Sequence, residues 1–221
     1  MRAKSNLKFR QRKDIANAIK QESLKKIRQV YGNVRASIAE TVQGLVRRQL
    51  FASNVTQSLL SGKLKKDFGL TQTSASKAIQ EIITYISNNS KIMLNPSTKA
   101  NTIAVFTLDL MPAGINGLKA IPAGSYSSAG KFGGGEVSWL TWLLERGTTV
   151  VIGDFWVFDS PKGTTRGGAV MQKVSKQHPD GFRVDPNFAG TKDNNFITRA
   201  LEPIIPQIRD SVFAKIQEGF K

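Results

Sequence analysis

The sequence predicts an α+β protein with a helical N-terminal half, followed by a small, mainly antiparallel sheet packed with a short helix and a C-terminal helix. Apolar residues recur every three or four positions up to about residue 90, which is typical of amphipathic helices. The spacing then changes to alternation among β-branched and aromatic residues, which is typical of strands. These patterns divide the chain into a basic helical region, 1–90, and an α+β region, 91–221.

Three helices are expected in the first region. Residues 13–30 carry apolar side chains at near-helical spacing, and Gly32 is placed to end that helix. From Val34 the apolar positions step by three and four, which predicts a longer helix that runs to about Leu60 and is ended by Ser61 and Gly62. Its apolar positions are Ile38, Val42, Leu45, Val46 and Leu50.

The third helix follows a basic stretch at 63–66. Thr73 or Ser74 is expected to cap its N-terminus, and the cluster at 88–90 is expected to end it. Its apolar positions are Ala78, Ile79, Ile82, Ile83 and Ile86. Residues 70–79 also permit a helix-turn-helix interpretation in which this helix enters a DNA groove, although a helical hairpin that buries its apolar stripe explains the same pattern.

Paired strands are expected at 91–94 and 102–110. Residues 112–135 contain seven glycines, which predicts an extended loop. Ser138 should begin a short helix that carries Trp139 and Trp142 inward and ends at Gly147. Strands at 149–158 and 168–174 follow, and Pro203 should begin the C-terminal helix.

Composition excludes several classes of protein. The 221 residues are 40% hydrophobic, which fits a folded chain rather than a disordered one. There is no cysteine, so disulfides and thiolate metal sites are excluded, and folding in a reducing cytoplasm is compatible with the sequence. No long apolar run and no signal peptide are recognised, so we expect no contact with a membrane.

The chain is strongly basic, with a formal net charge of +16. Residues 1–66 hold 16 basic and only three acidic residues. Clustered cations of this kind suit a polyanionic partner, either double-stranded DNA or an acidic protein, although a solvated helical face gives the same pattern. The expected contact residues are Lys8, Arg10, Arg12, Lys13, Lys25, Lys26, Arg28, Arg47, Arg48, Lys63, Lys65 and Lys66.

The sequence contains no recognisable enzyme signature. The single histidine, His178, lies in a turn-like segment without a nucleophile nearby. The glycines around Lys131 lack the spacing of a phosphate-binding loop, and no acidic cluster has the spacing of a metal site. We therefore expect no catalytic activity, no metal and no cofactor, and we interpret the glycine-rich segment as an assembly loop. Its residues are Gly124, Gly130, Lys131, Gly133, Gly134 and Gly135.

The C-terminal segment carries a family resemblance. The segment Asn195 to Leu201, preceded by Arg183-Val184-Asp185-Pro186 and Gly190, resembles the closing motif of minor-tail, tail-completion and neck proteins of tailed bacteriophages. The run from 139 to 171 resembles the segment that precedes this motif, so the resemblance covers roughly residues 136–221. The motif residues are Asn195, Phe196, Thr198, Arg199 and Leu201.

The resemblance implies a structural protein of the virion, assembled in the host bacterial cytoplasm. Copies would form a ring around the DNA channel as a head-to-tail connector or tail-completion subunit and would contact neighbouring neck and tail proteins. The alternative is a basic DNA-binding regulator or packaging accessory protein that uses the helical half. Within the motif, we expect Phe196, Ile197, Leu201 and Ile205 to be buried and Arg199 to anchor a loop or a neighbour.

Overall fold

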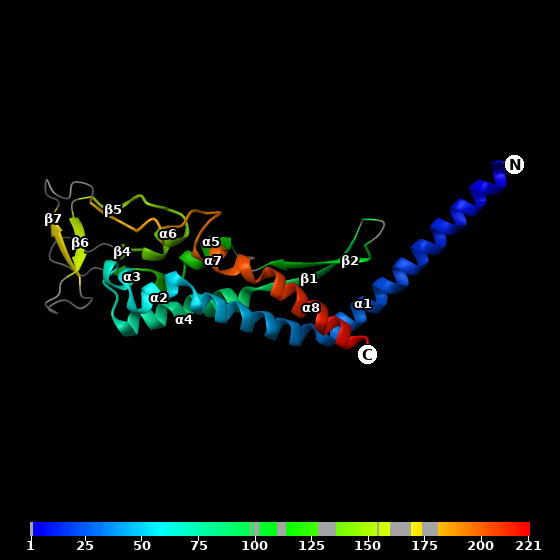
Figure 1. Ribbon diagram of the computed structural model, residues 1–221, viewed down its shortest axis with the longest axis horizontal. Coiled ribbons are helices and arrows are strands. Elements are labelled where there is room, and N and C mark those ends of the chain that lie inside the picture. Colours follow the sequence, from blue (N-terminus) through cyan, green and yellow to red (C-terminus); the bar gives the residue numbers. More distant parts are fainter. Residues whose placement is uncertain are drawn as a thin grey trace.

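The protein is elongated and mostly helical, and its fold is α+β as the sequence predicts (Figure 1). The computed structural model describes residues 2–97, 99, 102–109, 114–127, 136–153, 155–159, 169–173 and 181–221. Its helices are α1 (Arg2–Ala52), α2 (Asn54–Ser61), α3 (Lys63–Asp67), α4 (Gln72–Asn89), α5 (Gly114–Lys119), η1 (Pro122–Gly124), α6 (Trp139–Leu144), α7 (Phe196–Leu201), η2 (Glu202–Ile204) and α8 (Ile205–Gly219). No helix among the described residues is long and apolar enough to cross a membrane.

The strands of the described residues form four separate antiparallel pairs. The expected pairing of the first two strands is confirmed, whereas the strand expected over 149–158 is interrupted at Gly153 and forms two strands with different partners. The pairs are β1 (Lys91–Pro96) with β2 (Ala104–Asp109), β3 (Tyr126–Ser127) with β4 (Glu136–Val137), β5 (Val150–Ile152) with β8 (Phe182–Arg183), and β6 (Phe155–Asp159) with β7 (Ala169–Lys173).

The long first helix corrects two predicted boundaries. Gly32 does not end a helix, because its φ is not positive and the backbone continues through it as α1. Neighbouring Val30 and Val34 pack against Gly219 of α8, and this burial offsets the cost of a glycine inside a helix. The helix predicted to reach Leu60 is instead interrupted at Ser53. This residue has an extended backbone and is the N-cap of α2, because its hydroxyl oxygen accepts a hydrogen bond from the Thr56 amide.

Helix α4 begins two or three residues earlier than expected, because the expected cap was Thr73 or Ser74. Its N-cap is Thr71, whose Oγ1 accepts a hydrogen bond from the Ser74 amide at 3.2 Å, while the Thr71 amide donates to Ser74 Oγ at 2.9 Å. This reciprocal pair satisfies two amide donors at once. The helix ends at Asn89, within the cluster 88–90 that the sequence predicts as its end.

The described part of the glycine-rich segment is folded, which corrects the expectation of one extended loop. Residues 114–127 form α5, η1 and β3. Leu118 and Ile121 are buried in the core, and a Cβ at Gly124 would lie only 2.8 Å from the Leu140 side chain. Some of these glycines therefore permit close packing and left-handed backbone, as at Gly114 with φ 62°, instead of providing a loop.

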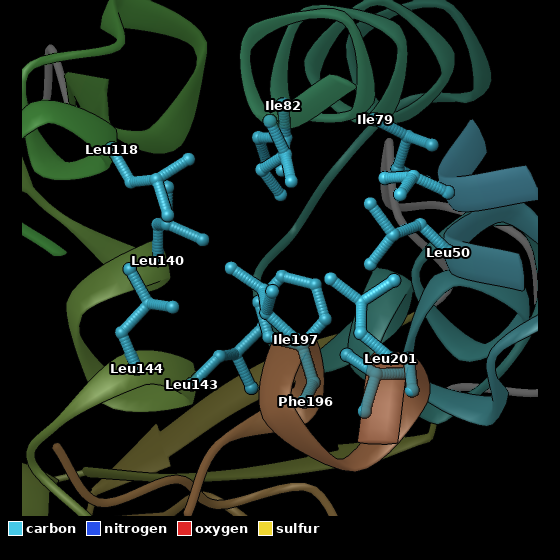
Figure 2. Close-up of a cluster of buried hydrophobic side chains, with 14 of the residues drawn as sticks. Leu50, Ile79, Ile82, Leu118, Leu140, Leu143, Leu144, Phe196, Ile197 and Leu201 are labelled. Atoms are coloured by element: carbon cyan, nitrogen blue, oxygen red, sulfur yellow. The ribbon is translucent and has the colours of Figure 1, made fainter. Parts of the chain in front are cut away.

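One hydrophobic cluster joins both halves of the chain. The part of it in Figure 2 has labelled side chains from α1, α4, α5, α6 and α7, which converge between these helices. The side chains labelled there are Leu50, Ile79, Ile82, Leu118, Leu140, Leu143, Leu144, Phe196, Ile197 and Leu201. The burial of Ile38, Val42, Val46 and Leu50 at intervals of four confirms the predicted stripe of α1.

Two elements lie at opposite ends of the molecule. The N-terminal part of α1 projects alone beyond the body, and the β6–β7 hairpin lies at the other end (Figure 1). Between them, α4 and α8 pack along α1. The β1–β2 hairpin extends toward the end of the molecule from which α1 projects.

Candidate assembly and nucleic-acid surfaces

The segment that carries the resemblance forms a capped helix start. Asn195 is fully buried, and its Oδ1 accepts hydrogen bonds from the amides of Ile197 at 3.0 Å and Thr198 at 3.2 Å. The Asn195 amide donates in return to Thr198 Oγ1 at 2.9 Å, which completes a capping box. Asn195 Nδ2 also donates to the carbonyls of Thr191 and Lys192, so this side chain fixes the preceding loop as well as α7.

The other motif residues hold α7 in place. Phe196, Ile197 and Leu201 are at most 4% exposed, as predicted. Arg199 donates to the carbonyls of Ala189 and Phe188, so it anchors a loop of its own chain.

The predicted burial of Ile205 is wrong. Its side chain is 48% exposed, while Ile204 is 9% exposed. The 3₁₀ turn at η2, which contains Pro203, lies between α7 and α8 and changes the helical register, so the preceding isoleucine faces the core.

Gly190 allows the motif loop to touch α6. Its amide donates to the Trp142 carbonyl at 3.3 Å, and its carbonyl accepts from the Gly147 amide at 2.8 Å. A Cβ at Gly190 would lie 1.9 Å from the Leu143 carbonyl oxygen, so no other residue fits without a backbone shift. Gly147 itself has a φ of 58°, the left-handed conformation predicted for it, although α6 ends earlier, at Leu144.

The tryptophans of α6 are core residues, as the sequence predicts. Trp139 is 1% exposed, and its ring centroid lies 5.7 Å from that of Phe68. Trp142 is 8% exposed, and the Arg146 guanidinium carbon lies 5.0 Å from its ring centroid. They are therefore not available for stacking on bases.

Several of the expected contact cations hold the fold together instead. Arg47 Nε donates to Ser87 Oγ and its Nη2 to Asn88 Oδ1, both at 3.0 Å, which joins α1 to the end of α4. Lys65 donates to Gln72 Oε1 at 2.8 Å. These bonds orient the side chains toward their own chain rather than toward a partner.

Lys63 forms an ion pair with Asp185 at 3.0 Å and joins α3 to the motif loop. The Asn187 backbone amide and, next, the Lys63 ammonium lower the pKa of Asp185 below its ordinary value. Asp185 is thus a charged loop anchor.

The remaining expected cations are dispersed along the molecule. Lys25, Lys26 and Arg48 are exposed on α1, whereas Lys66 lies on α3, far from the projecting end (Figure 1). The structure therefore does not bring the predicted set into one surface. Four more lie on the projecting part of α1, where the backbone alone is described: Lys8, Arg10, Arg12 and Lys13.

The expected assembly loop is divided. Gly124 is buried against Leu140, so it serves the core. The other five residues, Gly130, Lys131, Gly133, Gly134 and Gly135, lie outside the described residues.

The sequence missed a connection between α1 and the β1–β2 hairpin. Lys20 Nζ donates to the carbonyls of Ser97 at 2.8 Å and Lys99 at 3.0 Å, and the Tyr31 hydroxyl donates to the Ile92 carbonyl at 2.7 Å. These bonds tie the hairpin to α1 at two levels. No local pattern could have revealed them, because the bonded residues are 61 to 79 positions apart.

An apolar stripe on α8 was also missed as a surface. Ile205, Phe213 and Phe220 are about half exposed, at 48%, 51% and 49%. At 100° per residue they fall within an arc of roughly 80°. The sequence signal was present, because Ile205 and Phe213 belong to the apolar residues spaced along the C-terminal helix, but that spacing alone does not tell buried from exposed positions.

The described residues contain no group of three or more side chains suited to hold a metal ion. The single histidine, His178, lies outside them. A wide-open depression of about 560 Å³ beside α4 is lined by Lys77, Gln80, Glu81, Thr84, Tyr85 and Ile121. Its shape and lining do not indicate a reaction.

Comparisons with family models, curated proteins and solved structures found no match for this chain.

Proposed function

We propose that this chain is a structural virion protein of a tailed bacteriophage, a head-to-tail connector or tail-completion subunit whose copies form a ring around the DNA channel. The observation that carries the proposal is the resemblance of the segment Asn195 to Leu201, with its upstream Gly190, to the closing motif of such proteins. Each residue of this segment that we singled out has a defined role in joining α6, the motif loop and α7.

The arrangement of the molecule supports the proposal. A subunit of a closed ring needs different surfaces that meet head to tail. This chain offers a projecting helix at one end, a β-hairpin at the other and an apolar stripe on α8 between them (Figure 1). Exposed apolar surface of this kind is typical of a site of protein–protein contact.

The decisive experiment is a mass-spectrometric inventory of purified virions with copy numbers. We expect the chain to be present in a multiple set by the symmetry of a ring. Absence from the particle would refute the proposal, whatever the protein does in solution.

A variant pair would test whether α8 contributes to the ring contact. We expect Ile205→Gln combined with Phe220→Gln to reduce incorporation into virions, because both side chains are half exposed and outside the core. Phe51→Gln is the matched control, since Phe51 is 54% exposed at the end of α1. Equal incorporation of all three proteins would show that the ring uses another surface.

The second candidate is a DNA-binding regulator or packaging accessory protein, favoured by the excess of cations in the first third of the chain. Helix α4 packs its apolar face against α1 and α2. This is the packing of a helical hairpin, which is the alternative to the helix-turn-helix interpretation. A regulator requires strong preference for one DNA sequence and absence from the virion, so the two candidates are distinguished by the same inventory.

A further inference from the structure

We propose that the N-terminal part of α1, residues 2–28, binds duplex DNA through its phosphates and without sequence preference. The inference rests on the proposed function for its setting, the DNA channel. Its chemistry is argued from this segment alone, which we name the basic arm.

The basic arm carries a dense net positive charge. It contains ten basic and two acidic residues over a helical length of roughly 40 Å. Within residues 14–52 of α1, whose side chains the structure describes, no ion pair is formed. Phosphate neutralisation with release of counterions rewards such an array, whatever the DNA sequence.

The position of the basic arm leaves it accessible. Its N-terminal part projects beyond the body, and among the side chains that the structure describes Lys20 ties the arm to the tip of the β1–β2 hairpin (Figure 1). Between that tie and the one from Tyr31 to Ile92, Lys25, Lys26 and Arg28 of the arm are exposed. The hairpin tip adds a further cation, Lys99.

The shape of the basic arm suits a DNA groove. A helix with its side chains is about 10–12 Å across, and the major groove of B-DNA is about 12 Å wide. At 100° per residue, Lys25, Lys26 and Arg28 point in three different directions around the axis. This arrangement reaches phosphates on both sides of a groove and does not form the single face that reads base edges.

Other partners fit less well. A second copy would bring two arms of like charge together, which is unfavourable. Single-stranded nucleic acid is bound by stacking on aromatic side chains, and residues 1–28 contain one aromatic residue, Phe9. The major groove of duplex RNA is too narrow for side chains to enter. Duplex DNA is therefore the partner that we infer.

The test uses the full-length protein and fluorescence anisotropy of two unrelated 30-base-pair duplexes over a range of salt concentrations. The site variant is Lys25→Gln, Lys26→Gln and Arg28→Gln, which keeps helix propensity and alters only exposed side chains. The control is Lys77→Gln, Arg183→Gln and Lys192→Gln, which removes the same charge from exposed positions on other elements.

We expect the site variant to weaken binding to both duplexes about 10-fold or more at 0.1 M salt and to lower the salt slope by up to about 2.7. The control variant should retain most of the affinity and the slope. Equal weakening by the two variants would overturn the inference in favour of net charge alone.

Two further outcomes would also overturn it. If the wild-type protein binds polyglutamate but not DNA, and the site variant loses that binding, the partner is an acidic protein. A more than roughly 10-fold preference for one duplex would indicate base readout instead of phosphate contact. These measurements need no virion, so they can fail or succeed independently of the inventory that tests the proposed function.

Discussion

Replacing Gly190 with alanine should disrupt the junction between α6 and the motif loop. The new Cβ would lie 1.9 Å from the Leu143 carbonyl oxygen, whereas ordinary contacts begin at 3.4 Å, so the loop must retreat by roughly 1.5 Å. Such a movement breaks the hydrogen bonds from Gly190 N to Trp142 O and from Gly147 N to Gly190 O. Each is worth about 0.5–1.5 kcal/mol, and overpacking adds about 1–3 kcal/mol.

The expected loss is therefore about 2–6 kcal/mol of the free energy of unfolding, which lowers Tm by at least about 4 °C for a protein of this size. Thermal melting followed by circular dichroism measures it. Gly44→Ala is the matched control, because Gly44 lies within α1 with no atom within 4 Å of its new Cβ. That variant should gain about 0.5–1 kcal/mol. If Gly190→Ala melts within about 1 °C of the wild type, the close approach does not constrain the fold.

Three more variants or measurements test the structure. Leu201→Ala should cost about 2–5 kcal/mol, because its side chain is 2% exposed, and Ile205→Ala should cost much less; equal losses in denaturant unfolding would contradict the η2 register. Because the pKa of Asp185 is lowered in the folded state, its stabilisation is present above the ordinary value of 3.8 and is lost as pH falls through the folded pKa. Asp185→Asn should therefore be less stable than the wild type at pH 7, with a difference that narrows below pH 3.8, and a constant difference would show that the charge is irrelevant. Trypsin should cut at Lys131 before Lys119, because Lys119 ends α5 and pairs with Glu145 at 2.8 Å, and early cleavage after Lys119 would argue against that pairing.

Local patterns predicted the elements whose causes are local. The four-residue spacing from Ile38 to Leu50 gave the buried stripe of α1, and the change to alternation after residue 90 gave the β1–β2 pair. The family resemblance, combined with helical spacing, gave the burial of Phe196 and Leu201. These predictions succeed because helix and strand periods are properties of the backbone itself.

Predictions failed where distant residues decide the outcome. The sequence predicts a helix end at Gly32, but α1 packs against α8 and stays helical through this residue. The composition of residues 114–127 predicts a loop, but Leu118 and Ile121 are buried in the core and the segment is folded. In both cases the burial of apolar neighbours outweighs a local preference of about 1 kcal/mol.

The sequence by itself determined the α+β class, the excess of positive charge in the first third and the motif that carries the family resemblance. Only the tertiary structure decided which cations serve the fold and which are exposed: Arg47 and Lys63 bond to their own chain, while Lys25 and Lys26 are exposed on α1. The physical reason is that the charge of a side chain is fixed by its identity. Its partners are set by which elements pack beside it, and those contacts join residues as much as 122 positions apart.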